Sequence, residues 1–218
     1  LRKATDAPVF TFMTQKADES PNIFAVDESF NNPIQLTDTN TQQSDYYWAH
    51  SELVDFTNDN GVALQGRLLY PANYEPGKKY PMVVYIYELR SQSLHSYTTP
   101  SRSSAYNQRR FSSEGYFVYE PDIVYRLSDP GMSAVEALVP AVQKVVDTGM
   151  IDAARIGLTG HSWGAYQTAF VVTQTDIFSA AVAGAPLTNM ISMYNSIYWN
   201  SGGSDATIFE VSQGRFPK

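Results

Sequence analysis

The residues best suited to chemistry lie in one pentapeptide, Gly160-His161-Ser162-Trp163-Gly164. An apolar strand is predicted just before it, at residues 156–159, and an apolar helix just after it. A serine between glycines on a strand-to-helix turn is typical of a nucleophile elbow, where strained backbone holds the hydroxyl at the carboxyl edge of a parallel sheet. Ser162 is therefore the predicted nucleophile. The alternative is a packing turn in which Ser162 only caps the helix.

The helix that follows the turn is predicted to provide an amide donor next to the nucleophile. Its N-terminus is predicted to point at Ser162, so the backbone N–H of Trp163 and the positive end of the helix dipole can stabilise an anionic tetrahedral oxygen. Trp163 is accordingly predicted to form one half of an oxyanion hole.

A serine hydroxyl also needs a histidine base that is oriented by a carboxylate. In α/β hydrolases these groups follow the nucleophile in the order serine, acid, histidine. The chain has three histidines, His50, His95 and His161, and none of them follows Ser162. His161 is predicted to point away from the attack path, and the other two are predicted to lie at the surface.

The triad acid and base are therefore expected beyond Lys218. The acids nearest the C-terminus, Asp205 and Glu210, are given no catalytic role. We expect the chain to be a fragment that is nearly inactive by itself. A sheet that lacks its last strands has an open edge, so pairing with another copy into a homo-oligomer is a further expectation.

Composition narrows the classes of partner and cofactor. Fifteen basic against 22 acidic side chains give a net charge of −7, which disfavours nucleic acid and suits a neutral or cationic substrate. The chain has no cysteine and no histidine and carboxylate cluster with ligand spacing, so neither a metal nor another cofactor is expected. No apolar run reaches the roughly 18 residues of a membrane span. The compartment stays open between exported and cytoplasmic.

Alternating strands and helices predict an α/β fold with a mostly parallel sheet and helices on both faces. An Asn60-Gly61 turn predicts a hairpin at the start of this region. The predicted strands are 52–57, 64–70, 81–87, 116–120, 156–159 and 180–185, and the predicted helices are 104–114, 132–147 and the one after the elbow. The predicted sheet core is Val83, Ile86, Phe117, Ile156, Leu158, Val171 and Ala181.

The first 50 residues follow another pattern. Strands are predicted at residues 9–14, 22–27 and 35–37, and three short strands cannot bury a face alone. Residues 1–50 are therefore predicted to be the C-terminal part of a propeller-like β region with a linker, and residues 51–218 the N-terminal portion of an α/β-hydrolase catalytic domain. A simple hairpin extension is the alternative for the first segment.

With these features the sequence resembles the prolyl oligopeptidase family of serine peptidases, whose members place an α/β-hydrolase domain behind a β-propeller. The likeness rests on residues 111–116, on residues 151–157 leading into the elbow, and on Ala185-Pro186 after it. It implies hydrolysis of short peptide substrates through an acyl-enzyme. An esterase or acyl hydrolase on the same fold and a non-catalytic hydrolase-like scaffold are the alternatives.

The resemblance also implies roles for three tyrosines. Tyr87 matches the family position whose hydroxyl completes the oxyanion hole, although Glu88-Leu89-Arg90 replaces the family's glycine-rich turn. Tyr194 and Tyr198 match aromatic positions that line the pocket for the residue before the scissile bond. Their i, i+4 spacing predicts that both lie on one helix face. Ordinary packing of these rings is the alternative in each case.

Overall fold

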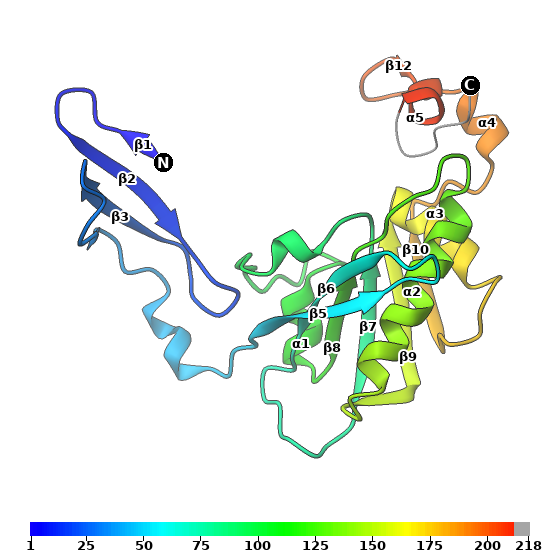
Figure 1. Ribbon diagram of the computed structural model, residues 1–218, viewed down its shortest axis with the longest axis horizontal. Helices are drawn as coiled ribbons and strands as arrows, with labels where there is room; N and C mark the ends of the chain where they lie inside the picture. Colours follow the sequence, from blue (N-terminus) through cyan, green and yellow to red (C-terminus); the bar gives the residue numbers. More distant parts are fainter. Residues whose placement is uncertain (212–218) are drawn as a thin grey trace.

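The computed structural model describes residues 1–211 and contains two main sheets (Figure 1). The smaller one is antiparallel and has the order β1-β2-β3-β4, with strands Arg2–Lys3, Val9–Thr14, Asn22–Asp27 and Ile34–Gln35. Figure 1 shows it standing apart from the larger sheet, with the 3-10 helix η1 (Thr41–Asp45) between them.

The small sheet has the hairpin that the sequence predicts. Strands β2 and β3 pair in register from Val9 with Asp27 to Thr14 with Asn22. The strand predicted at residues 35–37 lies slightly earlier, as β4 (Ile34–Gln35). Of the residues in these four strands, Val26 alone is buried, so this sheet has almost no core of its own.

The larger sheet has the order β10-β9-β7-β8-β6-β5, with strands Ala180–Gly184, Ile151–His161, Tyr80–Ile86, Phe117–Pro121, Ala63–Leu69 and Ser51–Thr57. Strand β7 is parallel to both β8 and β9, and β10 is parallel to β9. The hairpin β5-β6 is antiparallel and joins the sheet at β8. This arrangement confirms the predicted mostly parallel α/β sheet.

Local chemistry explains the β5-β6 turn. The Asn58 side-chain oxygen accepts hydrogen bonds from the backbone N–H groups of Asn60 and Val62. Gly61 follows with φ of 78°, a conformation that glycine adopts without steric cost. The predicted Asn-Gly hairpin is therefore confirmed.

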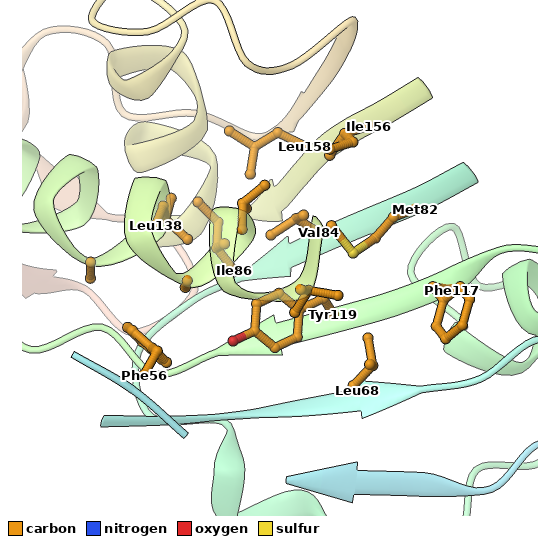
Figure 2. Packing of buried hydrophobic residues seen from close by; sticks show 14 of the residues in the cluster. Phe56, Leu68, Met82, Val84, Ile86, Phe117, Tyr119, Leu138, Ile156 and Leu158 are labelled. Carbon is orange, nitrogen blue, oxygen red and sulfur yellow. The ribbon is translucent and has the colours of Figure 1, made fainter. Parts of the chain in front are cut away.

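Side chains along a strand point alternately to the two faces of the sheet, and those that point toward the helices are fully buried. On β7, Met82, Val84 and Ile86 are fully buried on the side of helix α2 (Pro130–Val146), where Figure 2 shows them with Leu138. Helix α3 (Trp163–Val171) covers the same side next to β9. The register places Ile86 opposite Gly160, so the carboxyl end of β7 lies beside the end of β9.

Two of the predicted core residues are not in the core. Val83 is half-buried because it points to the other face of β7, and Ala181 is exposed because β10 is an edge strand in the described sheet. Val171 is buried, but on α3 and not in a strand. The remaining four, Ile86, Phe117, Ile156 and Leu158, are buried strand residues as predicted.

Two helices differ in their boundaries from the prediction. The predicted helix 104–114 is only α1, Gln108–Ser113, because the side chain of Asn107 accepts the Arg110 N–H and caps the helix there. Helix α2 begins at Pro130, slightly before the predicted start, since proline is pre-organised for a first helical turn. Among residues 1–211 no helix has both the length and the apolarity to cross a lipid bilayer.

The opposite face of the sheet holds a buried ionic cluster that the sequence did not predict. Glu120 on β8 is 1% exposed and accepts hydrogen bonds from Arg67 at 3.0 Å, Arg90 at 2.7 Å and Gln108 at 3.1 Å. Nearby, burial lowers the pKa of Arg109 to about 10. The cluster ties β6, β8 and the segment after β7 together.

Candidate active site

The predicted elbow is present at the end of β9. Ser162 joins β9 to α3 with φ of 55° and ψ of −116°, a combination that non-glycine residues rarely adopt. Its backbone N–H donates to the Gly184 carbonyl at 2.9 Å, and its own carbonyl accepts the N–H groups of Ala165 and Tyr166. The strained, non-helical backbone predicted for Ser162 is thus confirmed, and hydrogen bonds on both sides hold it.

Both glycines of the pentapeptide are required by close backbone approach. A Cβ atom on Gly160 would lie 2.4 Å from the Gly164 carbonyl oxygen. A Cβ atom on Gly164 would lie 2.2 Å from the carbonyl oxygen of Ile86 at the end of β7. These distances are far shorter than any normal contact, so the turn can form only where both positions lack a side chain.

A cavity of about 810 Å³ lies against this turn, and Ser162, Trp163 and Tyr87 line it together. The Trp163 ring is buried and packs on Tyr166, with ring centroids 5.0 Å apart. As the first residue of α3, Trp163 has a backbone N–H without an intrahelical acceptor. The cavity is therefore lined by a serine and by a residue whose backbone N–H is left free by the helix.

Tyr87 directly follows β7 and is half-buried at this cavity. Its carbonyl accepts a hydrogen bond from the Tyr125 hydroxyl at 2.7 Å, and that hydroxyl in turn accepts one from Gln167 at 2.8 Å. Burial raises the pKa of the Tyr125 phenol, so it remains a neutral donor. This chain of bonds fixes the Tyr87 backbone beside the elbow.

The far wall of the cavity comes from short elements after Pro186: α4 (Met190–Tyr194), β11 (Ile197–Tyr198), β12 (Gly203–Ser204) and α5 (Ala206–Val211). In Figure 1 the labelled elements of this segment, in orange to red, lie together beyond α3 at one end of the large sheet. The sequence predicted only an aromatic pair here.

The prediction that Tyr194 and Tyr198 share a helix face is wrong. Helix α4 ends at Tyr194, and Tyr198 belongs to β11, where it pairs with Gly203. Tyr198 lines the cavity with Ser162. Tyr194 does not line that cavity, because its hydroxyl donates to Glu210 at 2.7 Å and its ring packs on Phe209.

The three histidines lie outside the lining of this cavity. His161 is exposed, with its ring 5.4 Å from that of Tyr106, His50 stacks on Tyr70 at 4.2 Å, and His95 is exposed. None of them lines the cavity, and within residues 1–211 the Ser162 hydroxyl makes no hydrogen bond. The same residues contain no group of three or more histidines or acids that could hold a metal ion.

A mostly parallel sheet with a strained serine at a strand-to-helix turn is the arrangement of the α/β-hydrolase fold. Residues 128–209 match the sequence model of the prolyl oligopeptidase family. Venom dipeptidyl peptidase 4 of Vespa velutina is 30% identical over 159 residues, and human dipeptidyl peptidase 8 is 29% identical over 160 residues. The predicted resemblance to the prolyl oligopeptidase family of peptidases is therefore confirmed.

Solved structures agree on the fold. Pyrococcus horikoshii acylaminoacyl peptidase superposes with a TM-score of 0.69 at 18% identity, over 86% of this chain and 31% of its own. The AtxE2 isopeptidase superposes with a TM-score of 0.67 at 20% identity, over 97% of this chain and 34% of its own. In sequence, the matches cover 66% and 63% of this chain but only 20% and 17% of the two dipeptidyl peptidases. The chain thus corresponds to a small part of each relative.

Proposed function

We propose that this chain supplies the nucleophile side of a serine-type peptidase that cleaves short peptides through an acyl-enzyme. The observation that carries the proposal is the Ser162 backbone, with φ of 55°, at a cavity that Trp163, the first residue of α3, also lines. Such strain is costly for a serine and is found where the surrounding structure enforces it, often at active sites.

In this proposal each residue at the cavity has one role. Ser162 attacks the scissile carbonyl, and the Trp163 N–H and the Tyr87 hydroxyl stabilise the oxyanion that forms. Tyr198 contacts the residue before the scissile bond, and Tyr194, which holds Glu210, supports the wall behind it.

The proposal also assigns the triad acid and base and the two regions of the chain. Since no described histidine lines the cavity, we assign the triad acid and base to positions beyond Lys218. Residues 1–50 are assigned to a propeller-like β region with its linker, and residues 51–218 to the first portion of the catalytic domain.

The test compares the chain with a version that is extended beyond Lys218 by about 100 residues of the parent sequence, roughly the length that completes a domain. Both are assayed on a fluorogenic peptide and on a matched ester, with Ser162→Ala as control. We expect the extended form to hydrolyse the peptide, and Ser162→Ala to lower kcat by about 10⁴- to 10⁶-fold. The chain alone should be nearly inactive.

Three other outcomes would contradict parts of this proposal. Equal turnover by the short chain, abolished by Ser162→Ala, would mean that one of its own histidines acts as the base. Turnover of the ester without the peptide would identify an esterase. An extended form that is folded but inert on both substrates would favour the non-catalytic scaffold.

A further inference from the structure

Among the residues that the structure describes, a single charged side chain lines the cavity at Ser162. That residue is Asp205, which lies directly before α5. The others present hydroxyls, amides, apolar groups and the aromatic rings of Tyr87 and Tyr198. A lone carboxylate therefore sets the charge of this cavity.

Asp205 is only 8% exposed, yet it has few partners. One carboxylate oxygen, Oδ2, accepts the Ser196 hydroxyl at 2.7 Å. The other oxygen, Oδ1, accepts no hydrogen bond from the described residues, although it is not sealed off by protein atoms. No arginine or lysine of residues 1–211 forms an ion pair with it.

A buried carboxylate with one hydrogen-bond donor and no ion pair is unusual. Buried carboxylates are normally paired with a cation or satisfied by several donors, because removing an ion from water is costly. One serine hydroxyl provides only part of that compensation. A positive group placed in the cavity would supply the rest.

We propose that Asp205 binds a primary ammonium group of the substrate, from a free N-terminus or from a lysine side chain. This inference rests on the proposed function, since it names the substrate class of the same cavity. The ring of Tyr198 at the same cavity adds a surface on which a cation is attracted. The net charge of −7 also favours the approach of a cationic substrate.

Glu210 provides a matched control. It lies five residues from Asp205 on the same short segment, but its carboxylate accepts the Tyr194 hydroxyl and does not line the cavity. Asp205→Asn keeps the shape and an oxygen that can still accept the Ser196 hydroxyl. Both Asp205→Asn and Glu210→Gln remove one negative charge, so only position distinguishes them.

The first arm measures kcat/KM of the extended peptidase on four matched peptides: free or acetylated N-terminus, each with lysine or norleucine before the scissile bond. We expect a preference of about 10- to 100-fold for one ammonium source, the range of a charge-assisted hydrogen bond. Asp205→Asn should abolish that preference through KM, whereas Glu210→Gln should keep it. The pair of peptides that shows the preference identifies the source.

The second arm needs no turnover. Binding of all four peptides to the Ser162→Ala protein is measured by calorimetry. The peptides that carry the recognised ammonium should bind about 10- to 100-fold more tightly, and Asp205→Asn should remove that advantage. If hydrolysis fails but Asp205-dependent binding persists, the proposed function is wrong and the ammonium site stands. If hydrolysis proceeds with no preference for either ammonium in the unsubstituted enzyme, or with a preference that Asp205→Asn leaves intact, the ammonium site is refuted.

Discussion

The contact between Gly164 and Ile86 gives the sharpest test of the elbow. In Gly164→Ala the new Cβ would start 2.2 Å from the Ile86 carbonyl oxygen and 3.2 Å from its carbonyl carbon. Carbon and oxygen atoms in close contact normally stay about 3.3–3.6 Å apart, so β7 and α3 would have to separate by roughly 1 Å. Both atoms belong to backbone in a packed core, so neither can rotate away.

The magnitude follows from two opposing effects. Alanine is a better helix former than glycine by about 1 kcal/mol, which favours the variant. Overpacking costs about 1–3 kcal/mol, and a backbone contact places this site at the upper end. We therefore expect Gly164→Ala to lose about 2 kcal/mol or more of unfolding free energy.

The matched control is Gly157→Ala, within strand β9, where there is room for a side chain. Its Cβ would lie 3.8 Å from the nearest atom, the Ala180 carbonyl oxygen. This variant should stay within about 0.5 kcal/mol of the parent, as substitutions without a steric cause do. Urea unfolding followed by tryptophan fluorescence compares the two, with buried Trp163 as a reporter next to the elbow.

A second readout follows the nucleophile itself. A displacement of about 1 Å at the elbow is expected to slow Ser162 acylation in the extended protein by about 100-fold. A fluorophosphonate probe measures that rate directly. A Gly164→Ala variant that is as stable as the parent and reacts as fast would refute the close-approach argument.

Four further predictions rest on other parts of the sheet. Ile156→Ala should cost about 2–5 kcal/mol by urea unfolding, because the side chain is fully buried, and a loss below about 0.5 kcal/mol would mean that this strand is not core. Glu120→Gln should cost about 3–5 kcal/mol in the same assay, since it leaves two arginines around it without their carboxylate; a neutral effect would contradict the buried cluster. Val182→Lys, on the exposed edge strand β10, should reduce concentration-dependent self-association in sedimentation velocity, and a parent that is monomeric at every concentration would show that the edge does not pair. The hydrogen bond from Arg155 holds the pKa of the Asp152 carboxyl below its ordinary value. This pair therefore stabilises the fold at pH values above the ordinary carboxyl pKa, and the stabilisation is lost as pH falls through the lowered pKa. The difference between the urea midpoints of the parent and Asp152→Asn should accordingly disappear on acidification, and a difference that persists at low pH would contradict this.

The elbow was predictable from the sequence because its causes are local. A buried strand, two glycines and an apolar helix follow one another along residues 156–171, and each is recognisable from neighbouring residues. The same holds for the Asn60-Gly61 hairpin, whose turn is made by the side chain of Asn58 within the loop. These features needed no knowledge of distant contacts.

The errors concern features that distant segments decide. The i, i+4 spacing of Tyr194 and Tyr198 fits a helix, but Ser196 bonds to Asp205 and the chain turns into the β11-β12 pair instead. An apolar strand such as β7 does not show which face is covered, so Val83 was misplaced. Glu120 was missed because its partner Arg67 lies 53 residues away on another strand.

The two sides of the cavity are built with different rigidity, and this bears on function. Ser162 is held by strained backbone, by backbone hydrogen bonds and by glycine contacts to two core strands, so most changes there would disturb the sheet. The opposite wall consists of elements of two to six residues with largely exposed side chains, such as Tyr198 at 55%. Loops and short elements on a rigid scaffold tolerate substitution and commonly set specificity. Substitutions in residues 186–211, Asp205 included, should therefore change which substrates bind while leaving the reactivity of Ser162 toward a small probe intact.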